Sequence, residues 1–81
     1  MVNFIIIDDD FNQIEINKLI SFFEKREILF RNINKNQLNI REYPKSILIC
    51  SGDFLNNIGG KESLVKIARK LSSSKILILH S

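Results

Sequence analysis

Three runs of four consecutive apolar residues constrain the fold of this chain more than any other feature of its sequence. They occupy residues 4–7, 47–50 and 76–79. Because each run is apolar at every position rather than at alternate positions, each is typical of a β-strand that is covered on both faces. We therefore predict strands at 4–7, 46–50 and 75–79 in a parallel sheet flanked by helices.

Two amphipathic helices are predicted between these strands. In each, apolar residues recur at helical spacing and form one stripe that can pack on a sheet, namely Ile16, Leu19, Ile20 and Phe23 in the first and Leu64, Ile67, Ala68 and Leu71 in the second. The aspartates at 8–10 or Asn12 can cap the first helix, and Lys25-Arg26 close it. Residues 51–53 and 56–60 are predicted to be a turn-rich loop, and serines at 72–74 follow the second helix.

The alternation of strands and helices predicts a single α/β domain over residues 1–81, a small flavodoxin-like open parallel sheet of about four strands with two main helices. A further short strand is expected at 28–30. Residues 33–43 fit either a short helical turn anchored by Leu38 or an edge strand in which Leu38 and Ile40 alternate with polar residues. The second reading leads to the alternative architecture, an antiparallel α+β βαββαβ sandwich.

Composition narrows the class of protein. The chain has 44% hydrophobic and 26% charged residues, and no apolar run approaches the roughly 20 residues of a membrane span. A lone cysteine, Cys50, cannot form an internal disulfide, and its apolar neighbours favour burial. With no export signal at the N-terminus, a cytoplasmic protein without a membrane partner is expected.

An acidic segment follows the first strand. Asp8 and Asp9 are candidate ligands for Mg²⁺, since adjacent carboxylates at a strand end suit a hard cation; the alternative is that they only cap the next helix. The run Ile7-Asp8-Asp9-Asp10 resembles the start of response-regulator receiver domains, a resemblance that implies a Mg²⁺ pocket. The family's phosphoacceptor position at the end of the third strand is Cys50-Ser51 here, so the resemblance implies a receiver-like domain without its acceptor.

A second resemblance begins at Phe30-Arg31-Asn32 and continues through Leu79. It is to the N-terminal half of class I glutamine amidotransferase domains, in which such a triplet closes the second strand and a later strand leads into a Ser-Pro-Gly-Pro-Gly loop. The corresponding loop here, residues 50–54, lacks both prolines, and His80-Ser81 stands where the nucleophilic elbow would be. This resemblance implies a truncated, non-hydrolytic remnant or regulator.

Two further candidate sites lie around the second helix. Gly59, Gly60 and Lys61 open it and could cradle an anion with backbone N–H groups, although glycines also serve ordinary turns. Lys66, Arg69 and Lys70 are spaced to form one basic face, which could contact nucleic acid or an acidic protein, or be merely solvated. His80 has no partner at metal-ligand spacing.

No catalytic constellation is complete in the sequence, so no enzymatic activity and no cofactor other than Mg²⁺ are expected. The function expected is a non-catalytic protein-interaction or regulatory module, with a protein partner or a second copy of the chain pairing at an exposed strand edge. The alternatives are the receiver-like domain and nucleic-acid binding through the basic second helix.

Overall fold

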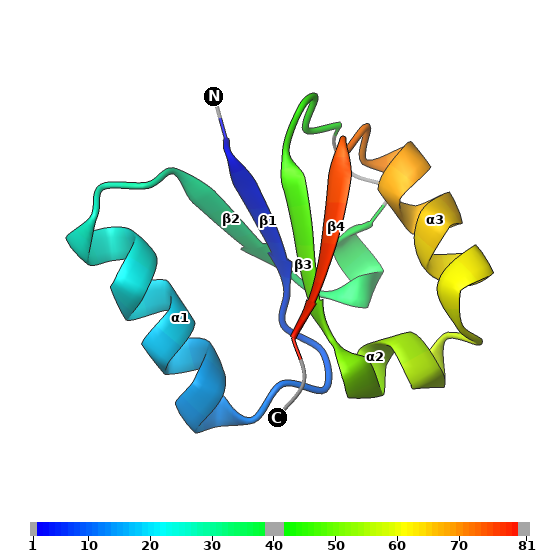
Figure 1. Cartoon of the computed structure of the whole chain (residues 1–81), viewed down its shortest axis with the longest axis horizontal. Coiled ribbons are helices and arrows are strands. Elements are labelled where there is room, and N and C mark those ends of the chain that lie inside the picture. Colours follow the sequence, from blue (N-terminus) through cyan, green and yellow to red (C-terminus); the bar gives the residue numbers. More distant parts are fainter. Residues whose placement is uncertain (1, 39–41, 80–81) are drawn as a thin grey trace.

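The sheet has four parallel strands in the order β2-β1-β3-β4, in a computed structural model that describes residues 2–38 and 42–79. Its elements are β1 (Phe4–Ile7), α1 (Gln13–Lys25), β2 (Phe30–Ile33), the 3₁₀ turn η1 (Lys35–Gln37), β3 (Ile47–Ser51), α2 (Gly52–Asn57), α3 (Lys61–Lys70) and β4 (Lys75–Leu79). Helix α1 covers one face of the sheet, and α2 and α3 cover the other (Figure 1). The predicted α/β fold with a small flavodoxin-like open sheet is confirmed.

The parallel pairing of all four strands excludes the antiparallel βαββαβ alternative. The ambiguous segment, residues 33–43, begins with the last residue of β2 and then forms η1. Asn34 and Gln37 cap the start of η1 by a reciprocal capping box. Leu38 packs against the core on the α3 side, so the helical-turn reading was the better one. Ile40, the other residue of that prediction, lies outside the described residues.

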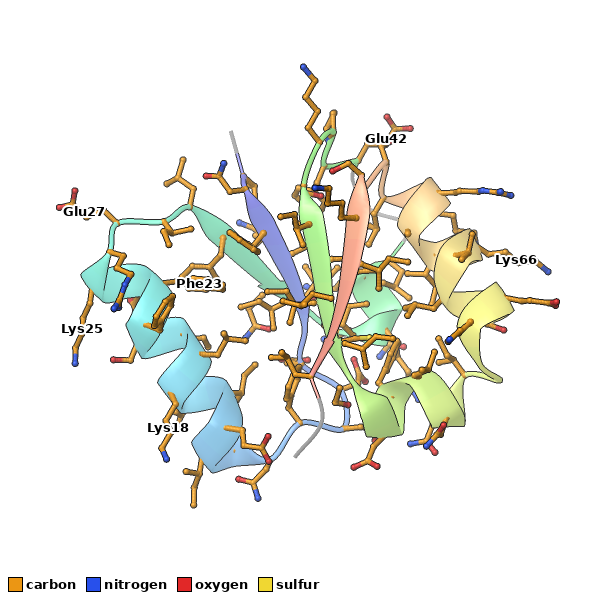
Figure 2. The ribbon with its side chains drawn as sticks, viewed as in Figure 1. Lys18, Phe23, Lys25, Glu27, Glu42 and Lys66 are labelled. Carbon is orange, nitrogen blue, oxygen red and sulfur yellow. The ribbon has the colours of Figure 1, made fainter. Side chains whose placement is uncertain are left out.

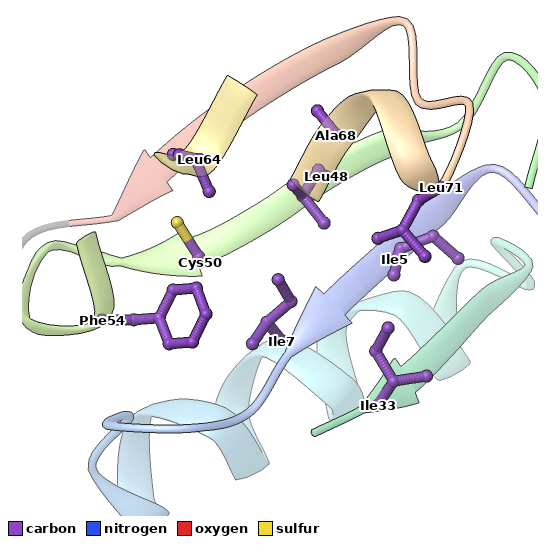
Figure 3. Packing of buried hydrophobic residues seen from close by; sticks show 9 residues of the cluster. All are labelled: Ile5, Ile7, Ile33, Leu48, Cys50, Phe54, Leu64, Ala68 and Leu71. Atoms are coloured by element: carbon purple, nitrogen blue, oxygen red, sulfur yellow. The ribbon is translucent and has the colours of Figure 1, made fainter. Parts of the chain in front are cut away.

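Two predictions about secondary structure were wrong. The second strand lies at Phe30–Ile33 rather than at 28–30, because pairing with β1 sets its register at Phe4 opposite Phe30. The loop predicted after the third strand contains helix α2, whose start is capped by the Ser51 hydroxyl accepting the N–H of Phe54 at 3.0 Å. Figure 3 shows Phe54 turned into the core beneath β3, which holds this short helix against the sheet.

Burial explains why β1 is apolar at every position. It lies between β2 and β3, and Ile5, Ile6 and Ile7 are each 0% exposed. Ile5 and Ile7 join the cluster under α3, whereas Ile6 joins the cluster under α1 with Ile16 and Phe23. Each such side chain contributes about 1.5–3 kcal/mol by leaving water. The two-sided core is therefore centred on β1 and β3.

The three α-helices end in the same way, with the N–H groups of the two following residues bonded back to carbonyls of the last turn. Glu27, Gly59 and Ser72 occupy the left-handed position after the helix, with φ of 55°, 99° and 57°. Glycine adopts this conformation without steric cost, whereas other residues are strained by about 1–2 kcal/mol.

We expect Glu27→Gly and Ser72→Gly each to raise the free energy of unfolding by about 0.5–1 kcal/mol, since relief of strain exceeds the added entropy of glycine in the unfolded chain. Urea unfolding of each variant beside the original chain measures this. The matched change Gly59→Ala, at a position where φ is already 99°, should destabilise the protein. A loss of stability in both glycine variants would contradict the assignment of these helix ends.

Candidate functional site: the uncovered face beside helix α1

The edge strand β4 is fully covered on one side only. Along β4, Ile76 and Ile78 point to the α3 side, and Lys75, Leu77 and Leu79 point to the α1 side because successive residues alternate. Helix α1 packs above β2, β1 and β3 on that face, in one cluster with Phe30, Ile6 and Ile49, and reaches only Leu79 at the end of β4. Leu77 consequently remains 46% exposed, although parallel sheets are normally covered on both faces.

A groove of about 460 Å³ lies between α1 and the end of β4. Its apolar lining is provided by Phe11, Leu19, Phe22 and Leu79, and Glu15 and Lys18 stand at its rim. Leu77 precedes Leu79 on the same side of β4 and extends the apolar floor toward the amino end of the strand. We call the surface formed by Phe11, Leu19, Phe22, Leu77 and Leu79 the docking groove.

Residues of α1 form the wall of this groove because the helix is apolar over more than its buried stripe. Ile16 and Phe23 face the sheet and are buried, whereas Phe22 is 46% exposed on the flank. The Arg26 guanidinium lies 3.8 Å from the centre of the Phe22 ring, and the Phe22 ring also meets Phe23 edge-on. These contacts hold the exposed ring in place.

The docking groove opens at one end into a polar pocket of about 340 Å³ at the carboxyl ends of β1 and β3. In an open parallel sheet, ligands bind where the chain crosses to opposite sides of neighbouring strands, as it does here. Three carboxylates, of Asp10, Glu15 and Asp53, line this pocket together with asparagine and serine side chains, and among the described residues no lysine or arginine does. The pocket therefore disfavours phosphates and other anions.

The predicted magnesium ligands have other surroundings. The Asp9 carboxylate accepts the backbone N–H of Lys35 at 2.7 Å and so joins the end of β1 to η1. Burial, and then repulsion by Asp9, raise the pKa of the Asp8 carboxyl above its ordinary value. Within residues 2–38 and 42–79, no three histidine, cysteine or acidic side chains gather as a metal-ligand set. Magnesium binding at Asp8 and Asp9 thus stays a prediction.

Asp8→Asn tests that prediction. The raised pKa means that ionising the Asp8 carboxyl costs more in the folded protein than in the unfolded chain. The free energy of unfolding therefore falls as pH rises through the pKa of the folded state. We therefore expect Asp8→Asn to raise the unfolding temperature at neutral pH and to lose that advantage in acid. If millimolar Mg²⁺ changes the unfolding temperature of neither protein, the predicted magnesium site is contradicted. A Mg²⁺-dependent rise in the original chain that Asp8→Asn removes would instead establish the metal site.

The predicted anion site has lost two of its donors to the fold. The Gly59 N–H donates to the carbonyl of Asn56 and the Gly60 N–H to that of Leu55, so both amides close the end of α2. The basic face of α3 forms as the spacing implied, with Lys66, Arg69 and Lys70 all exposed. Lys66 points away from the sheet on the side opposite α1 (Figure 2). Neither feature is continuous with the docking groove.

In the described part of the chain, the candidate nucleophiles at the end of β3 are either buried or used to cap a helix. Cys50 is 0% exposed and lies between Phe54 and Leu64 (Figure 3), and burial raises the pKa of its thiol to about 11. The neighbouring Ser51 hydroxyl serves as the cap of α2. The one histidine, His80, lies outside the described residues. The arrangement at the strand ends therefore offers no activated nucleophile in the described segments.

Cys50 provides a test of this packing. We expect its thiol to react with an aromatic disulfide reagent at mildly alkaline pH only as fast as the protein opens, and rapidly in denaturant. The unfolded thiol ionises near 9.0, so the free energy of unfolding should fall as pH rises from there toward 11. Cys50→Ala should lack this part of the pH dependence. Fast labelling of the folded chain would contradict the burial of Cys50.

Comparison of the chain with protein-family models, with curated proteins and with solved structures gave no match. In the segments that the structure describes, no helix has both the length and the apolar character needed to cross a membrane. The functional argument therefore rests on the geometry of the docking groove and on the chemistry of its rim. Sequence reasoning missed this surface, since it assigned candidate roles to charged residues and glycines.

Proposed function

We propose that this chain is a non-catalytic protein-interaction module that binds its partner in the docking groove. The observation that carries the proposal is an apolar groove lined by Phe22 and Leu79, beside which Leu77 is exposed on the same side of β4; Phe22 and Leu77 are each 46% exposed. A contiguous apolar surface of this kind on a small domain marks an interaction site more often than scattered exposed residues do. Burying it would also supply the missing cover for β4 on the α1 side of the sheet.

The non-catalytic part of the proposal is supported by the state of Cys50 and Ser51, of which one is buried and the other caps a helix. A single, reduced cysteine also supports a cytoplasmic location. Descent from an amidotransferase-like or receiver-like ancestor remains a proposal consistent with the strand order. It would account for a binding scaffold that retains strand-end acids and lacks a nucleophile at the end of β3.

Nucleic-acid binding through α3 is less well supported. The exposed basic residues Lys66 and Arg69 share a shallow surface with Glu62 and the 40% exposed Val65, and no aromatic side chain lines it. Stacking on aromatic rings usually accompanies such basic surfaces in single-strand binders. The docking groove, in contrast, contains two aromatic rings.

A displayed library of random peptides, selected on the intact chain, tests the proposal. We expect the enriched clones to bind the original protein and to lose binding to Leu77→Lys, which places a charge on the groove floor. Val65→Lys is the matched control, because Val65 is similarly exposed but lies on α3. Enriched clones that bind Leu77→Lys as well as the original chain, or an absence of enrichment, would contradict the proposed function.

A further inference from the structure

We infer that the docking groove accepts an amphipathic helix of another protein, lying along β4 and antiparallel to α1, with its acidic first turn at Arg26 and Lys75 and its basic last turn at Asp10, Glu15 and Asp53. This inference rests on the proposed function and specifies the partner. It is carried by the shape of the groove and by the distribution of charge at its two ends.

The shape fits a helix better than a loop. The floor follows the α1 side of β4, where Lys75 is followed by the apolar Leu77 and Leu79, and the five residues of the strand span about 16 Å at 3.3 Å per residue. A helix of about ten to eleven residues has this length at 1.5 Å per residue. Leu19 and Phe22, three positions apart on α1, present one ridge along the wall. A helix placed beside α1 can pack against this ridge and rest its apolar stripe on Leu77 and Leu79.

The two ends of the groove carry opposite charges. At the carboxyl ends of the strands, Asp10, Glu15 and Asp53 surround the pocket into which the groove opens. At the amino ends, Arg26 follows α1 and Lys75 begins β4 on the α1 side of the sheet. Helices commonly carry acids in the first turn and bases in the last. Such a helix satisfies both ends of the groove when it runs from Arg26 toward Asp53.

This direction is also favoured by the neighbouring helix. Helix α1 starts next to the acidic pocket, where Asn12 caps it, and ends next to the basic end at Lys25. A partner helix with the opposite direction places its dipole antiparallel to that of α1, which is the favourable arrangement for side-by-side helices. Side-chain charges and dipoles therefore favour the same orientation.

A second copy of the chain does not supply such a helix. The apolar stripes of α1 and α3 are already packed on their own sheet. The outward side of α1 carries Lys18 and Lys25, which extend away from the sheet (Figure 2), so a dimer packed through that side of α1 would bury lysines. Pairing of β4 with β4 of a second copy would occur in the plane of the sheet and would leave Leu77 uncovered.

The test uses a synthetic peptide with an apolar residue at i, i+3, i+4 and i+7, glutamates in its first turn and lysines in its last, bridged by a side-chain lactam to fix its helicity. We expect it to bind the intact chain about ten-fold more tightly than the same peptide with glutamines at both ends, because several exposed ion pairs are lost. At about 1 M salt, where charges are screened within about 3 Å, the two affinities should converge.

Orientation is read by NMR with a nitroxide at either end of the peptide. The label at the first turn should broaden the amide signals of Arg26 and Lys75, and the label at the last turn those of Asp10 and Asp53. The inference would be overturned if each label broadened the signals expected for the other label. Equal affinity of the charged and neutral peptides at low salt would overturn it as well. If library clones require Leu77 but neither helical peptide binds, the helix is the wrong occupant and the proposed function survives. If nothing that binds requires Leu77, both fail.

Discussion

Phe54→Ala should destabilise the protein by about 3–5 kcal/mol, the usual cost of removing a fully buried phenylalanine and leaving a cavity. Phe54 is 1% exposed and leads the fully buried side chains by volume. It packs in the same cluster as Ile7, Cys50 and Leu64, and it fixes α2 to the sheet. A domain of this size is stabilised by only about 4–12 kcal/mol in total, so a large fraction of the variant should unfold on mild heating.

Urea unfolding followed by far-ultraviolet circular dichroism measures this loss. Phe22→Ala is the matched control, since the same atoms are removed from a side chain that is 46% exposed and the cost should stay below about 1.5 kcal/mol. Equal losses in the two variants would show that α2 does not pack on the sheet in the way described.

Ser46→Val should cost about 2–3 kcal/mol, because it adds bulk at a buried polar position and removes its hydrogen bonds. Ser46 is 0% exposed. Its hydroxyl donates to the carbonyl of Tyr43 at 2.7 Å and lies 3.0 Å from the hydroxyl of Ser73, so it joins the segment before β3 to the segment before β4. The Ser46 carbonyl also accepts the N–H of Ser74 at 2.8 Å.

Thermal unfolding of Ser46→Val beside Ser46→Ala measures the contribution of this link. Alanine removes the hydroxyl without adding volume, so its cost should be smaller, about 1–2 kcal/mol. Should Ser46→Val prove as stable as the original chain, the burial of this serine between the two segments would be incorrect.

Elements with a local pattern could be predicted from the sequence. The stripe of Ile16, Leu19, Ile20 and Phe23 predicted α1, and the cap by Asn12 is present, with its carboxamide oxygen accepting the N–H of Ile14. The apolar runs predicted β1, β3 and β4 to within one residue. In these segments the local preference and the tertiary environment agree, which is why pattern alone was sufficient.

Elements that depend on tertiary contact could not be predicted in the same way. Residues 52–57 have the composition of a loop, and they form α2 because Ser51 caps the turn and Phe54 is buried beneath β3. The register of β2 follows from pairing with β1 rather than from its own residues. A Ser followed three residues later by an apolar residue was the one local signal for α2, and it is weak by itself.

The docking groove was missed for a related reason. The run at 76–79 is apolar at every position, so it predicted a strand covered on both faces, but α1 covers β2, β1 and β3 and leaves Leu77 on β4 exposed. The number of predicted helices could have indicated that part of the sheet lacks cover, because only two main helices were predicted for the two faces of about four strands. The sequence shows which residues are apolar and does not show which of them the chain itself covers.

Size-exclusion chromatography with light scattering, at low and high salt, tests most directly whether the docking groove is a free surface that awaits a different protein. The account predicts a monomer of 9.4 kDa for both the original chain and Leu77→Lys at both salt concentrations. A stable dimer of the original chain that Leu77→Lys converts to a monomer would contradict it, because a second copy would then be the occupant of the groove.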